Sequence, residues 1–126
     1  MGLLDGLLGN ASVVESDEVQ QELQPILGDD ESVVYACKEI RDMYIFTNKR
    51  LMLIDKQGVT GKKVEYHSVS YKAISHFSLE TAGHFDLDSE LKIWISGQSS
   101  PAIERELKNG ETVVGIQKAL ANFALG

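Results

Sequence analysis

The fold of this chain is decided by residues 41–66, which read RDMYIFTNKRLMLIDKQGVTGKKVEY. β-Branched and aromatic residues cluster there between turn-forming residues, a pattern typical of strands joined by short turns. We expect a hairpin closed at Asn48 and Lys49, followed by a glycine-containing loop and a third strand. This stretch builds the core of a sheet and carries no recognisable reaction site.

The hairpin has two apolar faces. A two-residue turn places Thr47 opposite Arg50, and the pairing continues to Met43 opposite Ile54. Because an antiparallel sheet usually leaves one face in water, we expect the second face to be covered by a helix or by another subunit. The first face carries Met43, Ile45, Met52 and Ile54, and the second, a candidate oligomer or cover interface, carries Tyr44, Phe46, Leu51 and Leu53.

Strand patterns fill the middle of the chain, and helical patterns lie at its ends. The fold class we predict is mainly β (α+β), a seven-stranded bent antiparallel sheet or partly open barrel capped by a C-terminal helix, with an N-terminal helical extension. We expect one structural domain, with an N-terminal helical arm over residues 1–30 and a β-rich part over residues 31–126. The predicted strands lie near 32–40, 43–47, 50–55, 64–70, 74–80, 90–96 and 102–107, and the predicted helices near 16–27 and 111–125.

Four leucines gather near the N-terminus at helical spacing. Leu3, Leu4, Leu7 and Leu8 would share one side of a short helix. The glycines between them each cost about 1 kcal/mol relative to alanine in a helix, so the segment needs a surface to dock on. It is our candidate cover for the hairpin.

Trp94 is predicted to point outward. Leu91, Ile93 and Ile95 share the opposite face of that strand and should point inward. An outward tryptophan either lies under the Pro101 loop or the N-terminal helix, or serves as an interface anchor, and both interpretations stay open.

The charge distribution and the cysteine content indicate which partners and which cellular compartment to expect. The net charge is −7, with eight acids and no Lys or Arg in residues 1–31 and seven bases in residues 38–63. A nucleic-acid binder would show an overall basic excess, so we expect no nucleic-acid partner. Cys37 is the lone cysteine, which favours a reducing compartment, and no apolar run reaches the roughly 20 residues of a membrane-spanning helix. We therefore expect a cytoplasmic protein.

The segments that resemble binding or catalytic motifs do not match the patterns of those motifs. Residues 58–63 resemble a phosphate loop, but the glycine spacing is wrong and no Ser or Thr follows the lysines. Lys62 and Lys63 remain as candidate anion contacts. His84, Asp86, Asp88 and Glu90 alternate as a metal site might, yet a single imidazole favours a solvated acidic loop. No nucleophile elbow is present. We expect no enzyme activity, no cofactor and no metal.

Four separated blocks carry a family resemblance. They are FTNKRL at 46–51, DKQGVTGKK at 55–63, ETAGHFDLD at 80–88 and ELKIWISG at 90–97. In order and spacing they resemble the bacterial pleckstrin-homology-like (PH-like) family, over about residues 12–125. The resemblance implies a seven-stranded bent sheet with a C-terminal helix, no enzymatic activity, and self-assembly into a closed ring such as a pentamer. It also implies a polar rim at neighbouring sheets that could receive another protein.

Two functions follow as hypotheses. The first is a non-catalytic, cyclic homo-oligomeric scaffold for protein–protein interaction, favoured by the two-sided apolar hairpin and the separated charges. The alternative is a peripheral membrane adaptor that inserts Leu3, Leu4, Leu7 and Leu8, helped by Lys62 and Lys63. Acids in the N-terminal arm oppose approach to anionic lipid, so we do not expect a membrane partner.

Overall fold

A computed structural model describes residues 13–39, 42–57, 62–81, 89–108 and 110–125. The chain forms two compact units, residues 1–68 and residues 69–126. All seven predicted strands are present, and an additional two-residue strand precedes them. Among the described residues the strands form two sheets, one of five strands and one of three, so the predicted mainly β class is confirmed.

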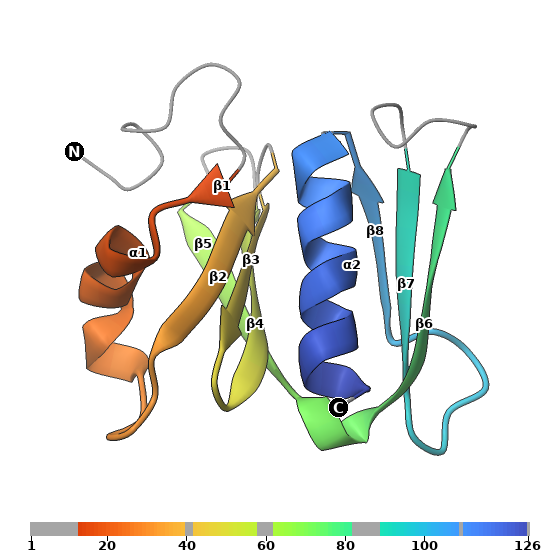
Figure 1. The fold of residues 1–126 in the computed structure, drawn as a ribbon, viewed down its shortest axis with the longest axis horizontal. Helices are drawn as coiled ribbons and strands as arrows, with labels where there is room; N and C mark the ends of the chain where they lie inside the picture. Colours follow the sequence, from red (N-terminus) through yellow and green to blue (C-terminus); the bar gives the residue numbers. More distant parts are fainter. Residues whose placement is uncertain (1–12, 40–41, 58–61, 82–88, 109, 126) are drawn as a thin grey trace. The chain divides into compact units, whose positions relative to one another are not determined.

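The N-terminal unit holds the five-stranded sheet, in the order β1-β2-β3-β4-β5 (Figure 1). The pairs from β1 to β4 are antiparallel. Strand β5 passes into the second unit at its last two residues. The elements are β1 (Val13–Val14), α1 (Ser16–Leu23), the 3-10 helix η2 (Gln24–Ile26), β2 (Val33–Lys38), β3 (Asp42–Thr47), β4 (Arg50–Gln57) and β5 (Lys63–Ser70).

Helix α1 is short and amphipathic. Asp17 and Glu18 lie in its first turn, where negative charge interacts favourably with the helix dipole. Val19 and Leu23, four residues apart, form its buried stripe. The α-helix ends at Leu23, earlier than the predicted residue 27, because Pro25 has no N–H to donate and the chain continues as η2.

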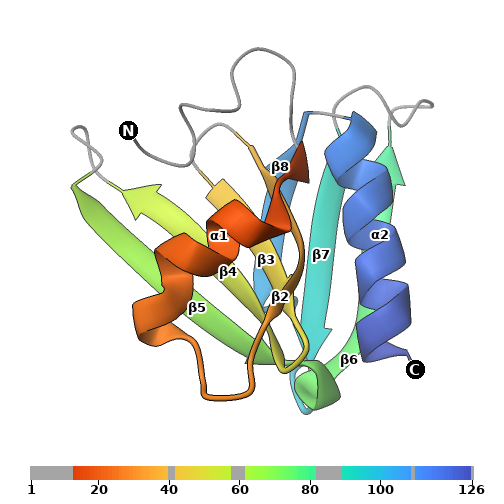
Figure 2. The same cartoon turned by 60° about the vertical axis from the view of Figure 1, so that its left-hand side comes forward.

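The hairpin of β3 and β4 has the predicted register. Met43 pairs with Ile54 and Phe46 pairs with Leu51. The face that carries Met43 and Ile54 packs against Val19 of α1, which lies across this sheet in Figure 2. The other face is buried as well, because Tyr44, Phe46, Leu51 and Leu53 are at most 3% exposed in the single chain. Both apolar faces are therefore covered without a second subunit.

The C-terminal unit holds the three-stranded antiparallel sheet, in the order β6-β7-β8, and a long helix. Its elements are the 3-10 helix η3 (Tyr71–Ala73), β6 (Ile74–Thr81), β7 (Ser89–Ile95), β8 (Ile103–Leu107) and α2 (Gly110–Ala124). Leu91 and Ile93 are buried, as predicted from alternation along β7, while Ile95 is half-buried.

Helix α2 packs against β8 and η3 (Figure 1). Val113, Ile116 and Leu120 are buried at helical spacing and form the apolar stripe of this helix, which was predicted near residues 111–125. Near the end of the helix, Phe123 stacks on Tyr71 of η3 with ring centroids 4.9 Å apart. These contacts hold α2 against β8 and η3 of its own unit.

Candidate functional site

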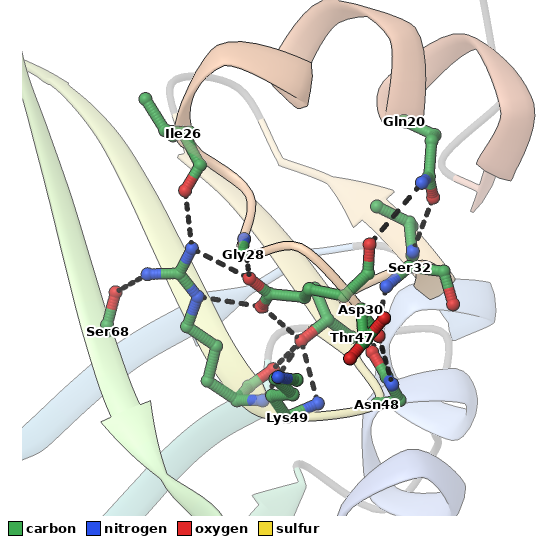
Figure 3. A network of polar contacts seen from close by, with 12 residues as sticks. Gln20, Ile26, Gly28, Asp30, Ser32, Thr47, Asn48, Lys49 and Ser68 are labelled. Carbon is green, nitrogen blue, oxygen red and sulfur yellow. Dashed lines mark hydrogen bonds and ion pairs between the residues drawn. The ribbon is translucent and has the colours of Figure 1, made fainter.

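Among the described residues, a cluster of polar contacts surrounds Glu31 and Arg50, and Figure 3 shows this network around Ile26, Gly28, Thr47 and Ser68. Arg50 donates from Nε to Glu31 Oε2 at 2.8 Å and from Nη2 to Glu31 Oε1 at 3.1 Å. The same guanidinium reaches the Ile26 carbonyl at 2.9 Å and Ser68 Oγ at 2.8 Å. One arginine thus joins η2, the loop before β2, and β5. We call this group the Glu31–Arg50 cluster.

Thr47 completes the coordination of the carboxylate. Its hydroxyl donates to Glu31 Oε2 at 2.6 Å and accepts the N–H groups of Lys49 and Arg50 at 3.0 and 2.9 Å. The backbone N–H of Gly28 donates to Glu31 Oε1 at 2.9 Å. Both carboxylate oxygens therefore receive two donors each.

Asn48 ties the hairpin turn to the preceding loop. Its Oδ1 accepts the Ser32 N–H at 2.8 Å, and its Nδ2 donates to the Asp30 carbonyl at 2.9 Å. Among the described residues no non-glycine residue has a positive φ. The Asn48–Lys49 turn is consequently not a type I′ turn, and side-chain hydrogen bonds hold it instead.

The cluster lowers the pKa of Glu31 from 4.5 to about 2. Burial alone raises this pKa, but the hydrogen bonds from Arg50, Gly28 and Thr47 and the charge of Arg50 outweigh burial. The carboxylate is ionised at neutral pH, and its side chain is 3% exposed. Such a closed ion pair stabilises the loop and offers no open position for a ligand.

A different polar surface covers one face of the C-terminal sheet. Alternation along three paired strands brings its side chains to the same side. We call this surface the outer face, and its residues are His76, Ser78, Glu80, Glu90, Lys92, Trp94, Glu104 and Glu106.

At one end of the outer face, Trp94 stacks on His76. Their ring centroids lie 4.3 Å apart at an interplanar angle of 19°. His76 is exposed and Trp94 is half-buried. Trp94 therefore lies on the predicted face of β7, and His76 of the neighbouring strand β6 is its stacking partner.

At the other end, carboxylates meet across the sheet. Glu80, Glu90 and Glu106 stand opposite one another in the register of the three strands. Lys92 lies 3.7 Å from Glu90 and 3.9 Å from Glu80, and Lys108 lies 3.6 Å from Glu106. These exposed ion pairs are long and contribute little, whereas like charges directly opposite destabilise a sheet.

Strand β5 stands at the margin of the five-stranded sheet. Its burial alternates poorly, because Lys63, Glu65, Tyr66 and Ser68 are all exposed. Tyr66 is 54% exposed. Lys62, which precedes the strand, is exposed too, so both lysines predicted as anion contacts are accessible to solvent.

The other predicted site residues divide into two groups. Leu3, Leu4, Leu7 and Leu8 lie outside the described residues, as do His84, Asp86 and Asp88. Tyr44, Phe46, Leu51 and Leu53 belong to the buried core. They cannot form a surface for a second copy while this core is intact. Among the members of the predicted interface set that the structure describes, Trp94 is the accessible one, and it is half-buried.

Cys37 is buried on β2. Burial raises the pKa of its thiol to about 12, and the charge of Glu39 adds to that effect against an opposing hydrogen bond from Tyr35. A protonated, buried thiol is a poor nucleophile. The described residues hold no group of three or more His, Cys, Asp or Glu placed to bind a metal ion. Within the same residues, no helix is long and apolar enough to cross a membrane.

Sequence reasoning missed the Glu31–Arg50 cluster. The two residues lie 19 positions apart, and neither periodicity nor a motif connects them. The one available signal was Thr47-Asn48 at the turn, since short polar side chains there bond to nearby backbone groups.

Comparison with known proteins places this geometry in a family. A family model for the bacterial PH domain matches residues 2–124. The uncharacterized protein YjqA of Bacillus subtilis (strain 168) is 58% identical over 121 residues, which cover 96% of this chain and 97% of YjqA.

Two solved structures are similar over nearly the whole length. A pleckstrin homology domain from Shewanella amazonensis SB2B is 62% identical, with a TM-score of 0.82 and coverage of 99% of this chain and 100% of that one. A DUF1696 family protein with a pleckstrin-homology domain from Shewanella loihica PV-4 is 66% identical, with a TM-score of 0.77 and coverage of 92% and 98%. The chain belongs to the bacterial PH domain family.

Proposed function

We propose that this chain is a non-catalytic PH-like domain that assembles head to tail into a cyclic homo-oligomer and acts as a scaffold for protein–protein interaction. The observation that carries the proposal is the state of β5. Among the described strands it pairs with β4 alone, and each of its faces carries exposed side chains, Lys63 and Glu65 on one and Tyr66 and Ser68 on the other.

An exposed edge strand is a template for pairing with another chain. Proteins that stay monomeric cover such an edge, shorten it or bury it. Strand β5 is eight residues long, and Tyr66 adds a large apolar surface at its middle. The charged side chains of Lys63 and Glu65 on the same strand disfavour unspecific pairing. They still permit pairing with a partner that carries complementary charges.

The second unit offers different edges. Among its described strands, β6 and β8 are the outer members of the three-stranded sheet. A contact between β5 of one copy and the second unit of the next joins two unlike surfaces. Such heterologous contacts repeat from copy to copy and produce a ring when the rotation closes.

The buried residues support a scaffold over an enzyme. Cys37, the one cysteine, is enclosed in the core with a high pKa. The carboxylate of Glu31 is saturated with donors. The charged side chains of the outer face, together with the half-buried Trp94, instead lie on one face of a sheet, which suits protein contact.

Light scattering coupled to size exclusion tests the proposal. The full chain at micromolar concentration should show a mass that is a multiple of 13.9 kDa. Tyr66→Lys should shift the mass towards one chain, because it places charge at the middle of β5. Val34→Lys is the matched control, since Val34 is 50% exposed on β2, away from the edge strand. A wild-type mass of one chain would refute the proposal.

A further inference from the structure

The outer face of the C-terminal sheet is asymmetric in charge. Four carboxylates, those of Glu80, Glu90, Glu104 and Glu106, stand on it against the ammonium groups of Lys92 and Lys108. Their side chains are accessible, with exposed fractions of 71% for Glu80 and 64% for Glu106. The face is a negatively charged surface open to solvent.

The arrangement of carboxylates on this face is electrostatically unfavourable for an isolated sheet. Glu80, Glu90 and Glu106 form one row across three strands, and each neighbouring pair is a like-charge pair in register. Lys92 and Lys108, the two ammonium groups beside this row, leave one of its three negative charges uncompensated. A cation from outside would relieve this repulsion.

An aromatic anchor lies at a defined distance from that row. Trp94 and Glu90 are four residues apart on β7, a separation of about 13 Å in a strand that rises about 3.3 Å per residue. Tryptophan is enriched among the residues that anchor protein interfaces. The face thus offers an aromatic contact and a negative contact along one line.

Strand β5 carries the complementary pair at the same spacing. Tyr66 is exposed, and extending the alternation of β5 by one residue puts Lys62 on the side of Tyr66, four positions away. Lys63 follows directly; by the same alternation it lies on the opposite side of the strand, and it is exposed as well. An aromatic residue and a positive charge are therefore also separated by about 13 Å.

We infer that the outer face of one copy receives the start of β5 of a second copy, with Tyr66 against the His76–Trp94 stack and Lys62 against the row of Glu80, Glu90 and Glu106, while Lys63, on the other side of the strand, adds a second positive charge near that row. This inference rests on the proposed function and specifies which surfaces meet in it. The contact joins unlike surfaces, so it is head to tail. It also predicts an assembly that weakens with salt, because exposed charges are screened.

A charge swap tests the contact. Lys62→Glu/Lys63→Glu makes the start of β5 negative, and Glu80→Lys/Glu106→Lys makes the outer face positive. Each double variant should associate at least about tenfold more weakly than wild type, because like charges then face each other. The quadruple variant carries both changes and should recover association to within about threefold of wild type, because opposite charges face each other again.

The matched control is Lys72→Glu/Lys118→Glu, which reverses two exposed lysines outside both surfaces and should leave association unchanged. Circular dichroism and thermal unfolding verify that each variant is folded. Sedimentation velocity gives the association constants, with wild type measured at low and high salt.

The possible outcomes distinguish failure of the inferred contact from failure of the proposed function. If wild type assembles and either double variant assembles equally well, or if the quadruple variant fails to recover, the inferred contact is wrong and the proposed function stands. If wild type remains a single chain, the proposed function fails and the contact fails with it. Loss in both double variants with recovery in the quadruple variant supports the contact.

Discussion

Two polar clusters in this molecule differ in how completely their carboxylates are paired with hydrogen-bond donors and cations. Glu31 is buried and receives four hydrogen bonds, two of them from Arg50. Within the described part of the chain, Glu90 on the outer face has one ion pair, at 3.7 Å from Lys92, and carboxylates on both sides in the sheet register. The contacts of Glu31 stabilise the folded chain, whereas the carboxylate of Glu90 can still accept hydrogen bonds or an ion pair from a partner. The difference separates residues that hold the fold from residues available to a partner.

Arg50→Met should produce the largest loss of stability. It leaves the Glu31 carboxylate buried without its counter-ion, for which removal of one partner typically costs about 3 kcal/mol or more. Urea unfolding measures this free energy. Lys49→Met is the control, since Lys49 is exposed in the adjacent turn and should change stability by less than about 0.5 kcal/mol. A loss below about 1 kcal/mol for Arg50→Met would show that the Glu31–Arg50 cluster is not a stabilising element.

Glu31→Gln should cost about 2 to 3 kcal/mol at neutral pH, because it removes the charge that Arg50 compensates. The pH dependence follows from the low pKa of Glu31 in the folded chain, about 2, against 4.5 ordinarily. The unfolded chain binds a proton on this group at a higher pH than the folded chain does. The stabilisation is therefore complete above about pH 5 and is lost as the pH falls towards 2.

Unfolding free energies at several acidic pH values check this sign. The difference between wild type and Glu31→Gln should shrink as the pH falls from about 5 to about 2. A difference that stays constant over this range would mean that the carboxylate has an ordinary pKa in the folded chain.

Thr47→Val should cost about 1 to 2 kcal/mol, because it removes one donor to Glu31 and leaves the Lys49 and Arg50 N–H groups without their acceptor. Thr112→Val is a matched control. Thr112 is also fully buried, but its hydroxyl has no hydrogen-bond partner among the described residues. Its replacement should be neutral or stabilising, as measured by urea unfolding. Equal costs at both positions would refute the role assigned to Thr47.

Glu90→Gln should have the smallest effect, a change within about 0.5 kcal/mol of zero and in the stabilising direction. The substitution removes a charge from the middle of the like-charge row at the expense of one long ion pair with Lys92. The same chemical change at Glu31 and at Glu90 thus gives results of different size. A loss of about 2 kcal/mol for Glu90→Gln would mean that Glu90 stabilises the fold as Glu31 does, which would contradict the difference between the two clusters.

The elements with local signals could be predicted from the sequence. The register of β3 and β4 follows from side-chain alternation and a two-residue turn, and the pairs from Met43 with Ile54 to Phe46 with Leu51 confirm it. The buried stripe of α2 follows from helical periodicity. Strand β1 has two residues, which is too short for any periodic pattern.

The candidate sites could be predicted only in part. Trp94 was identified because alternation along β7 turned it outward, but its stacking on His76 depends on the register between two strands. The same register creates the carboxylate row. The second apolar face of the hairpin was identified correctly, although the sequence could not show that a single chain buries it. Contacts between distant segments leave no periodic trace, and both polar clusters are of that kind.

The most direct test of head-to-tail assembly is sedimentation equilibrium of the full chain over a range of micromolar concentrations at low salt. A closed ring should appear as one species, whose mass is a fixed multiple of 13.9 kDa and which dissociates as salt is added. A mass of 13.9 kDa throughout the range would contradict it.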